Sequence, residues 1–239
     1  MSNASYQDVT VNLAFSDAAT VGTDYSKSDS IVIAAGSTSN TMTLTGSNDV
    51  LDEDDETIVV NISSVTNGTE DATPQLVTAI ITDDDATPTL SINDVPANEL
   101  NSGTSILGFT VTLSVASGRT VTIDYVTANG TATTTDSDYV AIGSTTLIFN
   151  PGDTTKTFNV TVNGDAVYET NETFNINLSS PSNATLADTQ GVGTITNDDN
   201  LPTVSFTTTI QNIAESTAST TITAQLSAES SQDVIAIPE

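Results

Sequence analysis

The sequence predicts an all-β protein made of tandem seven-stranded antiparallel β-sandwiches of immunoglobulin-like size. Three observations support this prediction. Short apolar runs alternate with polar residues in period two, the pattern returns after about 114 residues, and turn-forming residues separate the runs. About seven such runs fit in each repeat, as in an immunoglobulin-like sandwich. No segment shows the sustained 3.6-residue period of an amphipathic helix.

The repeat is visible in segments that recur in the same order. Pro88 returns as Pro202, 114 positions later, and Glu53 returns as Glu169, 116 positions later. The difference fits a small loop insertion at 142–150. The recurring segments are DDDATPTLSI (83–92) and NDDNLPTVSF (197–206), GTDY (22–25) and DSDY (136–139), and SNDVLDEDDETIVVNISS (47–64) and NGDAVYETNETFNINLSS (163–180).

Each run places apolar residues on one face of an expected strand. Val121, Ile123 and Tyr125 alternate with Thr122 and Asp124. One apolar face and one polar face are typical of a half-buried strand in an antiparallel sheet. The same alternation occurs at Phe158, Val160 and Val162, at Phe174, Ile176 and Leu178, and in the first repeat at Ile58, Val60 and Ile62.

The repeat pattern predicts that the chain consists of three parts. Residues 5–85 form a repeat that lacks its first two strands, and residues 86–199 form a complete repeat. Residues 200–239 contain the opening strands of a further repeat, at 203–206 and 220–226. These two strands leave apolar faces unburied by themselves. We therefore expect the tail of one chain to complete the first repeat of another, in a strand-exchanged homodimer or a head-to-tail chain.

Charge and composition exclude several classes of function. The chain has 31 Asp and Glu residues but only three basic residues, Lys27, Arg119 and Lys156. The resulting net charge of −28 opposes binding to nucleic acid or to anionic membranes. There is no Cys and no His, so the usual ligands of zinc, copper, haem and iron–sulfur clusters are missing. Histidine bases and cysteine nucleophiles are missing as well.

Four segments of the middle repeat carry a resemblance to a known family. They are GTATTTDSDY (130–139), FNPGDTTKTFNVTV (149–162), DAVYETNETFNINLSS (165–180) and GTITNDD (193–199). They resemble the Calx-beta repeats of sodium–calcium exchangers, an integrin beta subunit and large bacterial surface proteins, and the similarity runs over nearly the whole chain. It implies seven-stranded sandwiches that bind several calcium ions in loops at one end.

The resemblance also implies a set of calcium ligands in the acidic loops. In the middle repeat these are Glu99, Asp138, Asp165, Glu169, Glu172, Asn197, Asp198 and Asp199. In the first repeat they are Asp24, Asp49, Glu53, Glu56, Asp83, Asp84 and Asp85. In the tail, Glu215 stands at the position of Glu99, 116 residues later.

The sequence departs from the family pattern at three of these loop positions. Gly164 and Asn48 stand where the family often has an acidic residue, and Asn197 replaces the Asp that is equivalent to Asp83. An amide oxygen ligates calcium without contributing charge. We therefore expect fewer ions or weaker binding in the middle repeat.

The residues favour calcium independently of the resemblance. Calcium takes six to eight oxygen ligands, which Asp, Glu, Asn and backbone carbonyls supply, whereas magnesium suits such open carboxylate loops less well. Three successive acids at Asp83, Asp84 and Asp85 repel one another unless a cation neutralises them. The alternative is that the acids only solubilise turns, but they recur at three separate loops in each repeat.

We therefore expect a calcium-binding structural or adhesive repeat region of a large extracellular bacterial surface protein, secreted and represented here by a fragment without its signal peptide. Calcium is expected to rigidify domain tips and junctions, and other partners are cell-surface proteins or glycans. The alternative is a module that recognises glycans or another surface, although no Trp is present to form an aromatic platform. A hydrolase with paired carboxylates needs an acid inside a cleft, so we expect no enzymatic activity.

Overall fold

The computed structural model describes residues 4–73, 75–213, 215–216 and 219–235. Every regular element within these residues is a β-strand, which confirms the predicted all-β class. The described residues form no helix that is long and apolar enough to cross a membrane. The chain divides into two compact units, in which unit 1 comprises Met1–Ala86 with Ser117–Arg119, and unit 2 comprises Thr87–Ala116 with Thr120–Glu239.

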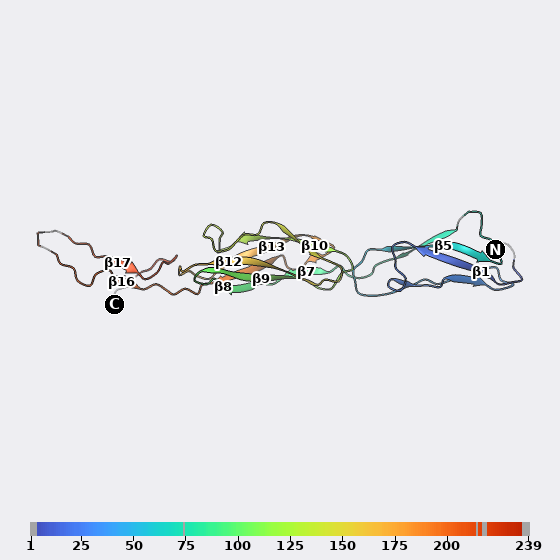
Figure 1. Cartoon of the computed structure of the whole chain (residues 1–239), viewed down its shortest axis with the longest axis horizontal. Helices are drawn as coiled ribbons and strands as arrows, with labels where there is room; N and C mark the ends of the chain where they lie inside the picture. Colours follow the sequence, from blue (N-terminus) through green and yellow to red (C-terminus); the bar gives the residue numbers. More distant parts are fainter. Residues whose placement is uncertain (1–3, 74, 214, 217–218, 236–239) are drawn as a thin grey trace. The chain divides into compact units, whose positions relative to one another are not determined.

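Unit 1 is built on one antiparallel sheet of four strands, drawn in blue and cyan in Figure 1. A second, much shorter pairing joins two strands of two residues each. The sheet order is β3 (Ser30–Ile33), β1 (Val9–Ser16), β5 (Glu56–Thr66) and β6 (Leu76–Ile81), and the short pair is β2 (Tyr25–Ser26) with β4 (Thr45–Gly46). Among the described residues of unit 1, the fully buried apolar side chains are Val9, Tyr25 and Ile58.

Unit 2 is a β-sandwich of two sheets. The first sheet runs β11 (Thr145–Phe149), β10 (Val121–Asn129), β13 (Glu172–Ser182), β15 (Gln190–Thr196) and β8 (Val95–Asn98). The second sheet runs β12 (Thr155–Gly164), β9 (Gly103–Leu113), β7 (Thr89–Ile92) and β14 (Thr185–Leu186). Aromatic side chains from both sheets meet in the core: the Tyr125 and Phe158 rings stack with centroids 4.0 Å apart, and Phe109 stacks on Phe158 at 5.5 Å.

The opening segment of unit 2 changes from one sheet to the other between β7 and β8. β7 pairs antiparallel with β9, whereas β8 pairs parallel with β15. Two side chains at the crossing accept hydrogen bonds, one from each sheet. Asn93 Oδ1 accepts the Thr110 N–H of β9 at 2.7 Å, and Asp94 Oδ1 accepts the Val192 N–H of β15 at 2.7 Å. Because β8 and β15 run parallel, the residues that follow them emerge at the same end of the sandwich.

The alternating pattern of the sequence matches the burial of unit 2. Val121, Ile123 and Tyr125 are buried, while Thr122 and Asp124 between them are half-buried. Tyr139 stacks on Phe174 with ring centroids 4.4 Å apart, and its hydroxyl donates to Asn129 Oδ1 at 2.6 Å. This contact supports the loop that follows β10, where the predicted ligand Asp138 lies.

The tail of the chain forms a short hairpin, drawn in red in Figure 1. It consists of β16 (Val204–Phe206) and β17 (Ala224–Leu226), which pair with each other only, as far as the described residues show. Backbone bonds hold its base on unit 2, because the Tyr168 N–H donates to the Glu229 carbonyl and the Ser231 N–H donates to the Tyr168 carbonyl.

Candidate metal centre

The parallel pairing of β8 with β15 assembles the first group of carboxylates in unit 2. Thr196 lies opposite Asn98 at the ends of these strands, and the Glu99 N–H donates to the Thr196 carbonyl at 3.2 Å. The next residues are Glu99 on one segment and Asp198 and Asp199 on the other. Each offers a carboxylate oxygen within 4.8 Å of the other two.

Two carboxylates of this group are buried, and part of each lacks a hydrogen-bond partner. Glu99 is 5% exposed and Asp199 is 9% exposed. Asn101 Nδ2 donates to Asp199 Oδ1. Glu99 Oε1 and Asp199 Oδ2 have no such donor among the described residues. A buried carboxylate oxygen without a partner is costly, and a bound cation removes that cost.

The second group in unit 2 consists of Asp138, Glu169 and Glu172. Asp138 lies in the loop between β10 and β11, Glu169 in the loop between β12 and β13, and Glu172 is the first residue of β13. Their carboxylate oxygens also lie within 4.8 Å of one another, and all three side chains are half-buried. The loop of Asp138 is fixed because its carboxylate accepts the Thr133 N–H at 2.6 Å.

Both groups hold negative charge in partly dehydrated surroundings. Burial raises the pKa of Glu99 from 4.5 to about 7, and the negative charges of Glu169 and Asp165 add to the effect. Burial also raises the pKa of Glu172 from 4.5 to about 7, with further contributions from a hydrogen bond to Asp138 and from its charge. The pKa of Glu169 is raised as well, chiefly by burial. Glu99 and Glu172 are therefore poised to bind either a proton or a metal cation near neutral pH.

Asp165 and Asn197 lie beside the two groups but already make hydrogen bonds within the loops. Asp165 Oδ1 accepts the Val167 N–H at 2.7 Å. Asn197 Oδ1 accepts the Glu169 N–H at 3.0 Å, and its Nδ2 donates to the Asp199 carbonyl at 3.1 Å. Asn197 thus links the segment of one group to the segment of the other.

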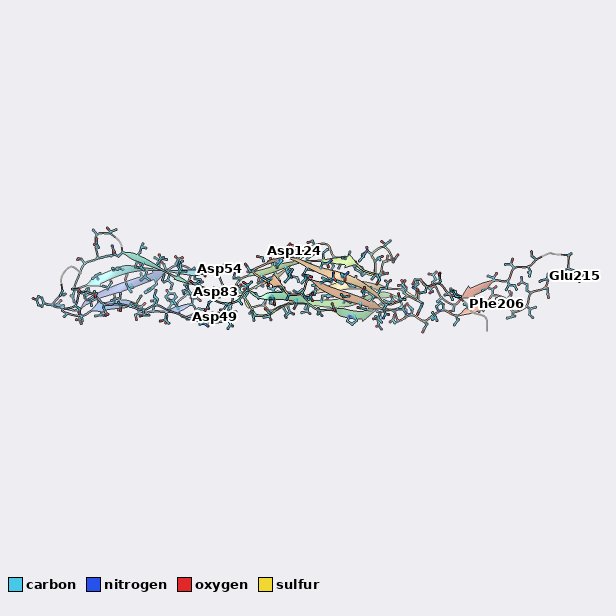
Figure 2. The ribbon with its side chains drawn as sticks, turned by 180° about the vertical axis from the view of Figure 1, so that it is seen from behind. Asp49, Asp54, Asp83, Asp124, Phe206 and Glu215 are labelled. Carbon is cyan, nitrogen blue, oxygen red and sulfur yellow. The ribbon has the colours of Figure 1, made fainter. Side chains whose placement is uncertain are left out.

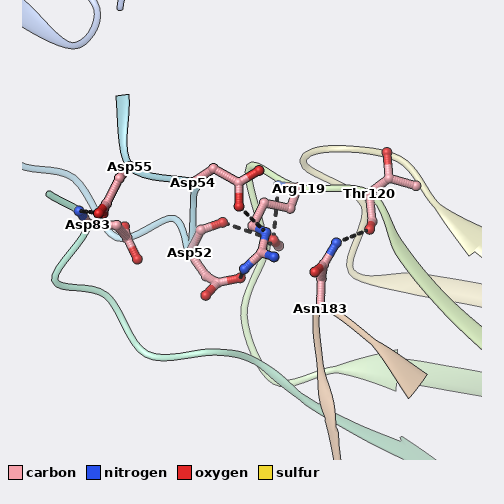
Figure 3. Close-up of polar contacts among 8 residues, drawn as sticks. Asp52, Asp54, Asp55, Asp83, Arg119, Thr120 and Asn183 are labelled. Atoms are coloured by element: carbon pink, nitrogen blue, oxygen red, sulfur yellow. Dashed lines mark hydrogen bonds and ion pairs between the residues drawn. The ribbon is translucent and has the colours of Figure 1, made fainter. Parts of the chain in front are cut away.

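The predicted ligands of the first repeat surround a hollow of about 240 Å³ in unit 1. Figure 2 shows Asp49, Asp54 and Asp83 gathered at one end of this unit. The lining includes all seven predicted residues, namely Asp24, Asp49, Glu53, Glu56, Asp83, Asp84 and Asp85. The Asp83 N–H is held by Asp55 Oδ1 at 3.1 Å (Figure 3).

The acids around the hollow in unit 1 are spaced more widely than those of the two groups in unit 2. Among the described residues of unit 1, no three of these carboxylates offer oxygens within 4.8 Å of one another. Burial, followed by the charges of Asp49 and Asp24, raises the pKa of Glu53. Burial and the neighbouring Asp24 raise the pKa of Glu56. Mutual repulsion is therefore present here too, although the acids stand farther apart.

Comparison with known proteins identifies the family. The model of the Calx-beta domain matches residues 1–85 and 88–200. The chain belongs to the Calx-beta domain family. No curated protein matches the chain significantly.

Three solved structures that resemble this Calx-beta chain are domains of Calx proteins. The apo form of the Calx CBD1 domain is 24% identical, with a TM-score of 0.40, over 48% of this chain and 100% of its own. CBD12 from CALX1.2 is 21% identical, with a TM-score of 0.33, over 74% and 69% of the two chains. The calcium-binding domain CBD12 of CALX1.1 is 18% identical, with a TM-score of 0.34, over 78% and 87%.

The departure of this Calx-beta chain at Gly164 has a steric cause. A Cβ added at Gly164 would clash with the backbone carbonyl oxygens of Leu100 and Glu99. The backbone at Glu99 and Leu100 passes so close to position 164 that an acidic side chain has no room there. Asn48, the counterpart in unit 1, is exposed and lines the hollow.

The structure does not bring Glu215 together with other predicted ligands. This residue lies exposed in the loop between β16 and β17 (Figure 2). Its counterpart Glu99 reaches its group because β8 pairs with β15, and the tail has no such pairing among the described residues.

Several residues around the Calx-beta loops were not predicted from the sequence. Asn101 donates to Asp199, and no spacing rule marks it. Arg119 forms ion pairs in unit 1 with Asp52 at 3.6 Å and with Asp54 at 3.0 Å (Figure 3). Arg119 is the only Arg in the chain, and this rarity was the one feature of the sequence that could have drawn attention to it. Nothing in the sequence placed it beside Asp52.

Proposed function

We propose that this chain is a calcium-binding structural repeat region in which the two carboxylate groups of unit 2 and the acidic hollow of unit 1 hold calcium ions. The observation that carries the proposal is the pair of buried oxygens without partners, Glu99 Oε1 and Asp199 Oδ2, beside the exposed carboxylate of Asp198. A cation that accepts several oxygen ligands satisfies both oxygens and neutralises the group.

The donor set supports calcium over other metals. The candidate ligands are carboxylates and amides, and the chain contains no His or Cys for zinc or copper. Calcium accepts six to eight oxygens in flexible geometry, whereas magnesium requires a tight octahedron. Glu99, Asp198 and Asp199 come from two segments, and Asp138, Glu169 and Glu172 from three. Such separate segments suit the more adaptable coordination of calcium.

A structural role follows from the position of these carboxylates. A metal ion that binds only the folded state adds about 1.4 kcal/mol of stability per site at tenfold excess over its dissociation constant. Each group joins loops that are distant in sequence, so an ion cross-links them and stiffens that end of the sandwich. We propose that calcium in this way rigidifies domain tips and junctions.

The cellular setting is proposed on the same basis. Extracellular modules bind calcium in the roughly 10⁻⁴–10⁻³ M range, where the ion acts as a permanent structural part. The chain has no Cys for disulfides, and metal ions are an alternative stabiliser for secreted repeats. We therefore propose a region of a large extracellular bacterial surface protein that contributes to adhesion, with cell-surface proteins as partners.

No specific observation favours glycan recognition or catalysis. Of the aromatic side chains in the described residues, Tyr6 and Phe206 are largely exposed, and they belong to different units. We propose that the chain is not an enzyme, because bound calcium would occupy Glu99 and Glu172, the two carboxylates whose pKa is raised to about 7. An assay of glycoside hydrolysis tests this proposal, and turnover that depends on either residue would contradict it.

The direct test of the metal site is calcium titration of the wild-type chain and of Glu99→Gln by calorimetry. Gln preserves the size of the side chain but removes its charge, so we expect the affinity of one site in unit 2 to fall at least tenfold. Asp124→Asn, a half-buried acid on β10 away from both groups, is the matched control and should bind as the wild type does. Equal binding by Glu99→Gln and the wild type would contradict the assignment.

A further inference from the structure

The tail hairpin reproduces the first hairpin of unit 2 in the same register. β7 and β9 are joined by three antiparallel pairs, and β16 and β17 are joined by three pairs at the corresponding positions. The pairs are Leu90–Leu113, Ser91–Thr112 and Ile92–Val111 in unit 2, and Val204–Leu226, Ser205–Gln225 and Phe206–Ala224 in the tail. The tail is therefore a preformed copy of the hairpin that opens a repeat.

The two hairpins differ in burial. Leu90 is fully buried and Ile92 is 6% exposed, whereas their counterparts Val204 and Phe206 are 45% and 67% exposed. A hollow of about 370 Å³ lies over the tail strands and is lined in part by Val204 and Leu226. An apolar face of this kind, with unpaired strand edges, is a surface that another chain can complete.

In unit 2 the apolar face of this hairpin packs in the core with the other sheet, and β9 continues its own sheet by pairing with β12. This ladder extends over ten residue pairs, from Thr155–Thr112 to Gly164–Gly103. It brings Phe109 of β9 into contact with Phe158 of β12, whose rings stack at 5.5 Å. Among the described residues, the tail has no strand in the place of β12.

The described residues of unit 1 contain the complementary arrangement: a segment that aligns with β12, and no strand among them that corresponds to β9. The segment GSTSNTMTLTG at 36–46 aligns with 152–162, so Met42 and Leu44 correspond to Phe158 and Val160. Met42 and Leu44 are only half-buried, whereas Phe158 and Val160 are buried. Within the described residues, no strand pairs with 38–44.

We propose that the β16–β17 hairpin of one chain inserts into unit 1 of a second copy, where β17 and the residues directly before it (219–226) pair antiparallel with segment 38–45. The repeat fixes the expected register: Thr157 lies opposite Thr110 in unit 2, so Thr41 of one copy lies opposite Thr223 of the other. Val204, Phe206 and Leu226 then pack into the second copy, as Leu90, Ile92 and Leu113 pack in unit 2. Tyr168 keeps its backbone bonds to the base of the hairpin.

Insertion also supplies unit 1 with the acid that its own described residues lack. Glu215 occupies the position of Glu99 in the repeat, and the inserted hairpin carries it toward the acidic hollow. The pairing itself rests on apolar burial and strand register, and does not depend on the proposed calcium function.

The first test is the mass of the full chain in solution, measured by sedimentation with and without the substitution Phe206→Asp. The wild type should sediment at twice the monomer mass or more, and Phe206→Asp should sediment as a monomer because the charge cannot enter an apolar core. Ser205→Asp adds the same charge to the other face of β16 and should leave the association intact. A monomeric wild type overturns the proposal.

The second test fixes register and partner by disulfide formation, which is simple because the chain has no Cys. Chains that carry only Thr41→Cys are mixed with chains that carry only Thr223→Cys under mild oxidation. The expected product is a disulfide-linked pair of the two different chains, with at least tenfold less product when Gln225→Cys replaces Thr223→Cys. Equal cross-linking of both partners, or a bond formed only when both cysteines share one chain, contradicts insertion into a second copy.

Discussion

Glu99 and Asp199 each bring a buried carboxylate oxygen within 4.8 Å of the other, although a hundred residues separate them in the sequence. The parallel pairing of β8 with β15 creates this relationship. Folding thus drives like charges together in a site where each residue has one oxygen without a partner. This arrangement costs free energy in the metal-free protein, and a bound cation offsets that cost.

Substitution of Asp199 should therefore raise the stability of the metal-free protein and lower the stability of the protein in calcium. Asp199→Asn keeps Oδ1 as the acceptor for Asn101 but removes a buried charge, so we expect a gain of about 1 kcal/mol in metal-free stability. For a unit of this size that is a rise in melting temperature of roughly 2–4 °C. In millimolar calcium the variant should melt below the wild type. Calorimetric scans with and without chelator measure both effects, and Asp124→Asn should show neither.

The raised pKa values of Glu99 and Glu172 predict an unusual dependence of stability on pH. Each pKa is 4.5 in the unfolded chain and about 7 in the metal-free folded protein, so the folded state binds more protons between these values. Stability should consequently fall as pH rises from about 5 to 7.5 in chelator. With saturating calcium the trend should disappear or reverse, because the ion replaces the protons. Denaturant titrations across this pH range test the prediction, and a metal-free stability that increases with pH would contradict it.

Position 164 and its counterpart 48 should respond in opposite ways to an added carboxylate. Gly164→Asp forces a side chain against the carbonyl oxygens of Leu100 and Glu99, so we expect a loss of about 1–3 kcal/mol and weaker calcium binding in unit 2. Asn48→Asp adds an acid to an open hollow and should strengthen binding in unit 1. Calorimetric titration of both variants measures the contrast. Stronger binding by Gly164→Asp would show that the steric argument is wrong.

The core beneath the second carboxylate group should dominate the stability of unit 2. Phe174→Ala removes a fully buried ring that stacks on Tyr139, at an expected cost of about 3–5 kcal/mol. Asn175→Ala, on the other face of β13, should cost less than about 1 kcal/mol. Chemical denaturation followed by far-UV circular dichroism compares the two. Similar costs for both substitutions would mean that this ring does not anchor the sandwich.

Much of the fold was predictable because alternation of apolar residues is a local signal. Val121, Ile123 and Tyr125 are buried as their period-two spacing indicated. The change of sheets between β7 and β8 was not predictable, because it depends on how Asn93 and Asp94 bond to distant strands. That crossing decides where Glu99 lies.

The candidate site was predictable as a set of loops but not as separate groups. The repeat placed Asp138, Glu169 and Glu172 at matching loop positions, and the structure brings their carboxylates together. Spacing alone could not show that Gly164 leaves no room for a side chain, or that Asn101 reaches Asp199. Both depend on backbone segments that meet only after folding.

The measurement that tests the central claim most directly is thermal melting of the full chain during calcium titration from chelator to millimolar calcium, with magnesium at equal ionic strength as the control. Calcium binding predicts a melting temperature that rises by several degrees per site as calcium saturates, with heat released or absorbed in a parallel calorimetric titration, and a much smaller response to magnesium. If calcium changes neither the melting temperature nor the heat signal, the carboxylate groups of Glu99 and Glu172 are not calcium sites.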